Sequence, residues 1–315
     1  MANTGNGVGT SLYTRKSTGL VRDISVGSAF AMNIAFLSFP YGFLLATLGP
    51  FSFPGSNIAL VVLLAAVLVI FPIILYGSLG QVMPRSGGDY VFVSRIISPC
   101  VGFASSFNIQ LWFVIATAGL AASLAPFGLG SAFGAIGVAT GNTGMTHLAT
   151  VVSSRTWQFW LGAGVLAATM LMISFKLRSW LKVFNVLFYL VILGLLVMVY
   201  LLATHSRGSF QGSLAHFGVS YSGILHAASK DGYAGGGVFS LKNTILATPL
   251  AASSFVFGIA STYYGGEIRQ ASRTMLKGLM YAVGAFAILY GVCLLLAERT
   301  LGQSFLGSAT FLGAC

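Results

Sequence analysis

The sequence predicts an all-α polytopic membrane protein with about seven transmembrane helices. Of its 315 residues, 56% are hydrophobic and only 7% are charged, whereas charged residues make up about 25% of an average soluble domain. The mean hydropathy is +0.89, and several apolar runs reach roughly 20 residues, the length of helix that crosses about 30 Å of hydrocarbon. This composition excludes a soluble globular domain, a disordered chain and a disulfide-stabilised scaffold.

The apolar runs predict seven spans, at residues 25–48, 58–80, 97–126, 157–175, 181–203, 244–266 and 278–297. Short basic connections follow the second, fourth and sixth spans, as expected of loops on one side of the membrane. A Gly- and Ser-rich connection follows the third span. A long polar segment, 204–243, separates the fifth span from the sixth, and we expect it to contain a short interfacial helix.

The charges predict the orientation of these spans. Lys and Arg number 16 against 5 Asp and Glu, a formal net charge of +11, and membrane proteins collect Lys and Arg in their cytoplasmic loops. With residues 1–24 as a cytoplasmic tail that is not a signal peptide, eleven of the sixteen cations fall in cytoplasmic segments and 204–243 is extracellular. We therefore expect a multi-pass protein of the cell membrane that contacts lipid and binds no nucleic acid.

No Asp, Glu or Lys lies near the middle of any predicted span. The acids fall at span ends or in loops, at Asp23, Asp89, Asp231, Glu267 and Glu298. A membrane enzyme or metal site would need acids or histidines at membrane depth. We therefore expect no enzyme activity, catalytic residue, metal or cofactor. A polar ligand at mid-membrane must be held by backbone groups and small hydroxyls, and a cationic ligand is disfavoured.

Two spans carry residues that interrupt a helix. In the first span, Pro40 lacks a backbone N–H and Gly42 tolerates unusual dihedral angles; in the sixth, Gly258 lies near mid-membrane among small hydroxyl residues. Broken backbone in hydrocarbon is tolerated only where it is buried or lines a cavity. Freed N–H groups attract a carboxylate and freed carbonyls attract an ammonium, so two breaks suit a zwitterion. The alternative is a proline kink in the first span and a packing glycine in the sixth.

Two segments carry a resemblance to a known family. Between the second and third spans, the matching residues are Pro84, Gly87, Gly88, Tyr90, Phe92, Arg95, Pro99 and Gly102. They resemble the cytoplasmic signature of the amino acid, polyamine and organocation (APC) superfamily of permeases. After the sixth span, GGEIRQASRTMLKGL resembles the family's acidic, basic and amide segment, with Ala271 where the family has proline.

The resemblance implies a LeuT-like transporter fold of two inverted five-helix repeats. Residues 25–203 would form the first repeat, and 244–315 would begin the second, which is incomplete because only two of its helices are present. We therefore interpret the sequence as C-terminally truncated, as an incomplete record, or as half of a split protein. The missing helices, or a partner chain, would complete the pathway.

The resemblance also implies secondary active transport of an amino acid or related amine by alternating access. Carried over by position, the substrate-binding residues are Ser38, Phe39, Pro40, Tyr41, Gly42, Phe113, Thr117, Phe257, Gly258, Ile259 and Ala260, and the cytoplasmic gate loop contains Pro84, Gly87, Gly88 and Tyr90. The family's first Gly-x-Gly is replaced by Phe39 and Tyr41. The lysine that some members use for proton coupling aligns near Leu190 or Val191, so symport or antiport with protons stays one option among several.

The substrate and two other functions stay open. Aromatic residues near both breaks suggest a medium or large apolar amino acid, but the sequence does not identify it. A seven-helix receptor or sensor would explain the number of spans without truncation. A non-transporting membrane subunit is the third interpretation.

Overall fold

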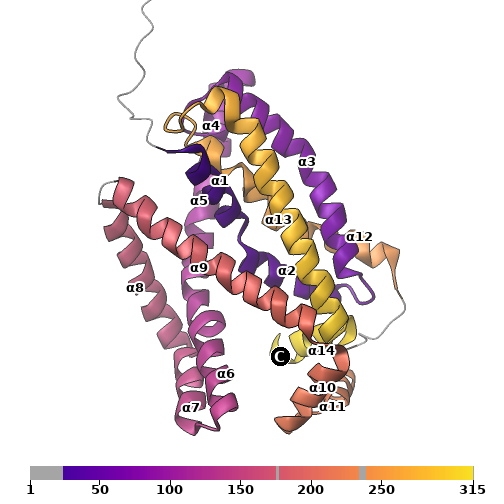
Figure 1. Cartoon of the computed structure of the whole chain (residues 1–315). Coiled ribbons are helices and arrows are strands. Elements are labelled where there is room, and N and C mark those ends of the chain that lie inside the picture. The colour runs from indigo at the N-terminus through magenta and orange to yellow at the C-terminus, as the bar shows by residue number, and fades with distance from the viewer. Residues whose placement is uncertain (1–23, 175–176, 234–238, 315) are drawn as a thin grey trace, which may run out of the picture.

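The computed structural model describes residues 24–174, 177–233 and 239–314, in which every regular element is a helix (Figure 1). Seven helical stretches in these ranges are long and apolar enough to cross a membrane, which confirms the predicted all-α multi-pass fold. They are Val26–Phe43, Ile58–Val82, Pro99–Thr140, Arg155–Ser174, Trp180–Thr204, Leu241–Tyr263 and Ala271–Leu301.

The helices follow one another along the chain with short connections. They are α1 (Val26–Leu37), α2 (Phe39–Ser52), α3 (Ile58–Val82), α4 (Asp89–Ile96), α5 (Pro99–Ser123), the π-helix η1 (Leu124–Gly130), α6 (Ser131–Thr140), α7 (Thr143–Val152), α8 (Arg155–Ser174), α9 (Leu177–Thr204), α10 (Arg207–His216), α11 (Tyr221–Lys230), α12 (Leu241–Val256), the 3-10 helix η2 (Phe257–Tyr263), α13 (Ala271–Leu301) and α14 (Gln303–Ala314).

Two connections differ from the sequence-based expectation. The Gly-rich stretch after residue 126 is helical, because its glycines allow close helix packing: a Cβ atom at Gly137 of α6 would lie 2.8 Å from the backbone N of Thr146 on α7. The chain turns only at Gly141, whose φ of 67° is left-handed. The segment 204–243 contains two short helices, α10 and α11, where one was expected.

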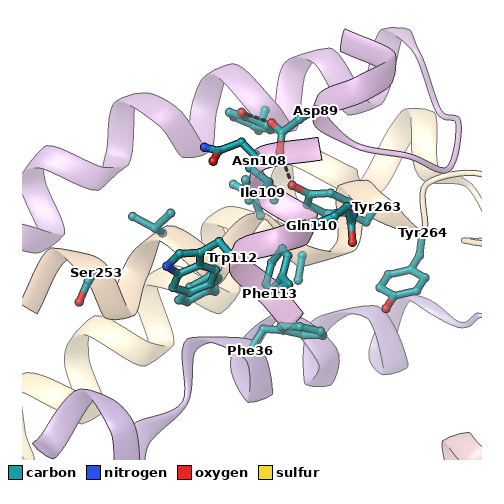
Figure 2. A pocket seen from close by; sticks show the side chains of 15 residues that line it. Phe36, Asp89, Asn108, Ile109, Gln110, Trp112, Phe113, Ser253, Tyr263 and Tyr264 are labelled. Carbon is teal, nitrogen blue, oxygen red and sulfur yellow. Dashed lines mark hydrogen bonds between the residues drawn. The ribbon is translucent and has the colours of Figure 1, made fainter. Parts of the chain in front are cut away.

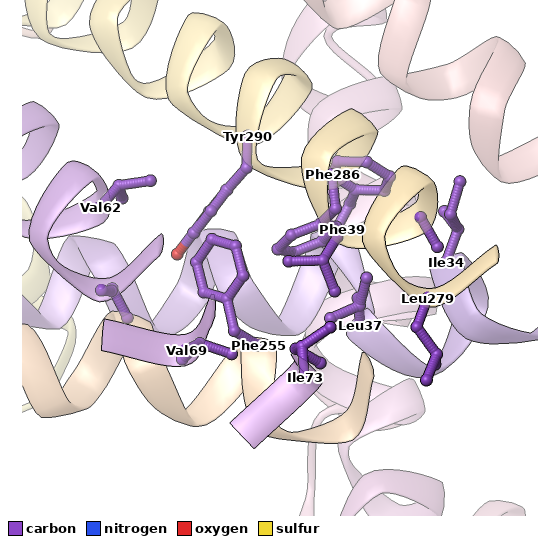
Figure 3. Close-up of a cluster of buried hydrophobic side chains, with 14 of the residues drawn as sticks. Ile34, Leu37, Phe39, Val62, Val69, Ile73, Phe255, Leu279, Phe286 and Tyr290 are labelled. Carbon is purple, nitrogen blue, oxygen red and sulfur yellow. The ribbon is translucent and has the colours of Figure 1, made fainter. Parts of the chain in front are cut away.

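The core lies among α1, α2, α3, α12 and α13, the helices of spans one, two, six and seven (Figure 3). The ring of Phe286 on α13 lies 4.6 Å from that of Phe39 on α2 and 5.1 Å from that of Phe255 on α12. Span one packs on span six through α1 against η2 and α2 against α12, while α3 and α13 run side by side (Figure 1). The division into two repeats, at 25–203 and 244–315, stays a prediction.

The remaining spans are much less covered by protein. Only 6% of the most apolar window of α8 and of α9 is buried, against 50% of the window that covers α12 and η2. Apolar side chains that face outward suit a lipid environment. The core therefore consists of spans one, two, six and seven. Helices α5 and α8 form a second packed pair.

At the end of the core away from α4, Asn57 joins three helices. It is the N-cap residue of α3, and its backbone N–H donates to Oγ1 of Thr244 on α12, at 3.1 Å. Its side-chain amide donates to Oε1 of Glu298 on α13, also at 3.1 Å. One residue thus fixes the position of α3 relative to α12 and α13.

Because Gly77 has no side chain, α3 can approach α13 closely at this position. A substitution at Gly77 tests this contact. A Cβ atom at Gly77 would lie 3.0 Å from Cα of Leu276 on α13. Gly77→Val should destabilise the protein by about 1–3 kcal/mol through overpacking, measured as a lower Tm in detergent. The control Gly284→Val, on α13 with no atom within 4 Å of its Cβ position, should leave the Tm nearly unchanged. Equal losses in both variants would contradict the packing argument.

Candidate functional site

The first span is broken at Ser38, as its sequence predicts. Ser38 has φ 50° and ψ 86°, a left-handed conformation between α1 and α2. Pro40 lies in the first turn of α2, where the absent N–H costs no helical hydrogen bond. The two halves of the span are thus separate helices.

The sixth span changes from α-helix to 3-10 helix at Phe257, and an asparagine of the first span satisfies part of its backbone. Asn33 is 1% exposed, and its Oδ1 accepts the backbone N–H of Ser261 at 2.8 Å. The carbonyl of Ile259 accepts from Oγ1 of Thr262 at 2.7 Å. The two irregular spans are therefore joined directly.

A cavity of about 620 Å³ lies beside the 3-10 segment, a size typical of small-molecule sites (Figure 2). Its walls come from α1, α3, α4, α5, α12 and η2. They are formed by Phe36, Tyr76, Asp89, Asn108, Ile109, Gln110, Trp112, Phe113, Ser253, Val256, Phe257, Ile259, Ala260, Tyr263 and Tyr264. Most of this lining is aromatic or aliphatic, with a few polar groups.

The geometry of η2 accounts for three of its four residues that line the cavity, the fourth being Ile259 on an adjacent face. A 3-10 helix has three residues per turn, so Phe257, Ala260 and Tyr263 lie on one face, and all three line the cavity. Gly258 faces the opposite side, where its Cβ position is 2.8 Å from Cγ2 of Val283 and 3.1 Å from Cδ2 of Leu37. It contributes close packing in the core rather than cavity wall.

The sequence-predicted substrate residues therefore divide into two groups. The cavity brings together four of them, Phe113, Phe257, Ile259 and Ala260. The first-span group Ser38, Phe39, Pro40, Tyr41 and Gly42 does not line it, nor do Gly258 and Thr117. Thr117 is exposed on α5.

Two residues of the first-span group, Phe39 and Gly42, are buried in the core, whereas Pro40 is exposed. Phe39 packs on Phe286, and the carbonyl of Gly42 accepts the hydroxyl of Tyr290. A Cβ atom at Gly42 would lie 3.2 Å from Oγ of Ser254. Because Gly42 has no side chain, α2 can approach α12 and α13 closely at this position.

Asp89 lies between the second and third spans, as the sequence indicates, but it is a buried acid that lines the cavity, which the sequence did not reveal. Its side chain is 4% exposed and lines the cavity. Oδ1 accepts the hydroxyl of Tyr76 on α3, and Oδ2 accepts that of Tyr263 on η2. The loop turns back toward the cavity before α4, and the position of Asp89 in the sequence did not reveal this.

The glycine pair of the loop places Asp89. Gly87 and Gly88 have φ of 122° and 45°, which favour glycine. Gly87 donates its N–H to the carbonyl of Tyr263 at 3.0 Å, and a Cβ atom at Gly88 would lie 2.8 Å from the Tyr263 ring. Pro84 is half-buried and Tyr90 exposed, so the glycines make the close contact.

Other signature residues have structural roles. Phe92 is buried and packs edge-on to Tyr76, and a Cβ atom at Gly102 would lie 2.8 Å from the backbone N of Ser94. Near the same end of the cavity, burial raises the pKa of Tyr264, and the Glu267 carboxylate raises it further. The hydroxyl of Tyr264 therefore stays uncharged near neutral pH.

Irregular backbone beside a small-molecule cavity within apolar spans is the arrangement found at transporter binding sites. Residues 24–303 match the family model described as amino acid permease. The chain therefore belongs to the amino acid permease family, as its loop signature indicated. Comparisons with curated proteins and with solved structures gave no significant match.

The bond between Asn33 and Ser261 is testable by removing the acceptor. Asn33→Leu leaves the Ser261 N–H buried without its partner, which should cost about 1–3 kcal/mol and lower the Tm. Ser261→Ala keeps this backbone bond and removes only the hydroxyl contact with Met275, so its effect should be smaller. A larger loss in Ser261→Ala would contradict the role of Asn33.

Gly88 combines an unusual backbone conformation, φ 45° and ψ −120°, with a close contact, and a second glycine in the αL conformation, without such a contact, gives a comparison. Gly141 also has a positive φ, 67°, but no atom within 4 Å of its Cβ position. Gly88→Ala should therefore reduce both stability and transport more than Gly141→Ala, because only Gly88→Ala pushes the Tyr263 ring. Thermal melting and substrate flux of the two variants provide the comparison. Equal effects would contradict the expected importance of the Gly88 conformation and of its contact with Tyr263.

Proposed function

We propose that this protein is a secondary active transporter that moves an amino acid across the cell membrane by alternating access, and that it is not an enzyme. The observation that carries the proposal is the 620 Å³ cavity beside the 3-10 segment of span six. Irregular backbone at membrane depth is characteristic of transporter binding sites. The family match supports amino acids as the substrate class.

The aromatic wall favours an amino acid with an apolar side chain. The ring of Phe257 lies 5.3 Å from that of Trp112 and 6.0 Å from that of Phe113. These three rings and the aliphatic residues of α5 and α12 present a surface that gains from burying hydrocarbon. The backbone polar groups of η2 and the amides Asn108 and Gln110 remain for the zwitterionic end.

The loop containing Pro84, Gly87, Gly88 and Tyr90 is proposed as the cytoplasmic gate, with the N-terminus on the same side. It packs on the end of η2 through Tyr263. Ile24 lies at this end as well, since its N–H donates to the carbonyl of Glu267 and its carbonyl accepts the N–H of Arg269. Movement of the loop would therefore act on the end of span six that borders the cavity.

Counterflow in proteoliposomes tests transport directly. Purified protein is reconstituted, each of the common amino acids is loaded inside in turn, and uptake of the same radiolabelled amino acid is followed. We expect uptake above protein-free liposomes for at least one apolar amino acid. Saturable binding of an amino acid without counterflow would instead favour a receptor or sensor, and neither binding nor counterflow would favour a non-transporting subunit.

The aromatic wall predicts which side chain sets affinity. Phe257→Ala removes a ring that touches both Trp112 and Phe113, and it should weaken apparent affinity by about tenfold or more, since one buried aromatic ring contributes at least 1.4 kcal/mol. Thr117→Val, on α5 outside the cavity, is the matched control and should keep wild-type affinity. A stronger effect at Thr117 would place the substrate elsewhere.

A further inference from the structure

We propose that Asp89 binds the ammonium group of the substrate, so that the cavity recognises an apolar molecule by its amine more than by its carboxylate. This inference rests on the proposed transport function and narrows its substrate class. Among the described residues that line the cavity, Asp89 is the only one with a formal charge (Figure 2). Because a buried charge is costly unless it is paired, the cavity favours a ligand that brings a cation to this carboxylate.

The carboxylate of Asp89 is oriented by the protein and can still accept an ammonium. Oδ1 accepts the hydroxyl of Tyr76 on α3, and Oδ2 accepts that of Tyr263 on η2. An ionised carboxylate offers about four acceptor positions, so these two bonds leave positions for a further donor. Asp89 also lies in the first turn of α4, where the helix dipole stabilises a negative charge. The anionic group is therefore in place before a substrate binds.

The carboxylate of a zwitterionic substrate has weaker partners in this cavity. The start of α2 could attract a carboxylate with its free N–H groups, but no described residue of α2 lines the cavity. On η2, the N–H of Ser261 already donates to Asn33. The side chains of Asn108 and Gln110 offer amide donors, which carry no charge. The amine of the substrate therefore contributes more to recognition than its carboxylate.

The rest of the lining fits the body of an organic amine. The rings of Trp112, Phe113 and Phe257 form the aromatic wall of the same cavity. The rings of Tyr76 and Tyr263, which hold Asp89, also line it, and aromatic rings attract organic cations. The proposal reverses the sequence-based expectation that a cationic ligand is disfavoured, because that expectation considered only acids within the spans.

Isothermal titration calorimetry of the full chain in lipid nanodiscs tests this role. The probes are isobutylamine, isoamylamine and phenethylamine, which are valine, leucine and phenylalanine without the carboxylate. Each amine is compared with the alcohol of the same hydrocarbon body, after subtraction of the heats from protein-free nanodiscs. We expect at least one amine to bind about tenfold or more tightly than its alcohol, the equivalent of one hydrogen bond to a charged group. Hydrocinnamate, which is phenylalanine without the amine, should bind more weakly than phenethylamine.

The preference for the amine over the alcohol separates the charge of Asp89 from its part in folding. Asp89→Asn should reduce this preference by about tenfold or more, whereas general damage to the cavity would weaken both ligands alike. Tyr76→Phe removes one orienting bond but keeps the charge, so it should retain most of the preference. Asp231→Asn, at an exposed acid outside the cavity, is the control and should behave as wild type.

The outcomes separate this inference from the proposed function. A wild-type protein that binds none of the amines, or binds them no better than the alcohols, overturns the role of Asp89 whether or not the variants fold. An Asp89→Asn protein with the full wild-type preference also overturns it. Counterflow of an amino acid without amine binding would leave transport standing and refute this inference. Amine binding that depends on Asp89, without counterflow of any amino acid, would support this site and refute transport.

Discussion

In hydrocarbon, a backbone N–H that leaves a helical hydrogen-bond pattern must find another acceptor, and this constraint governs where the chain can break. The 3-10 segment of span six meets it through Oδ1 of Asn33, which accepts the Ser261 N–H at 2.8 Å. The bond places the two irregular spans in contact. The cavity lies beside the 3-10 segment that this hydrogen bond holds. The bond from the buried Ser261 N–H therefore helps to position the cavity wall.

The helices and the first break could be predicted because their causes are local. Runs of apolar residues define the spans, and Pro40 with Gly42 marks the interruption between α1 and α2. The positive φ of Gly87 and Gly88 explains why two glycines occur together in the loop. The Gly-rich stretch after residue 126 forms helices instead of the expected connection, because its glycines contact α7 across a helix interface and only Gly141 makes the turn.

Much of the site could not be predicted, because it depends on contacts between distant segments. Asp89 and Tyr263 are 174 residues apart, and Asn33 and Ser261 are 228 apart. A signal for Asn33 was present, since a lone amide within an apolar span usually has a buried partner. No comparable signal marked Asp89. The 3-10 geometry of η2 turns Gly258 toward the core, and the sequence did not predict this geometry.

The length of α13 has a consequence for the lipid around the protein. Its 31 residues extend roughly 46 Å at 1.5 Å per residue, well beyond the hydrocarbon thickness. Lys277 and Glu298 bracket about 20 of these residues, or roughly 30 Å of helix, which equals that thickness. A thinner bilayer would therefore have to deform or tilt this helix. Because α13 packs along α3, tilting α13 would also shift α3 and the core between them. We therefore expect this protein's activity to depend on the thickness of the bilayer.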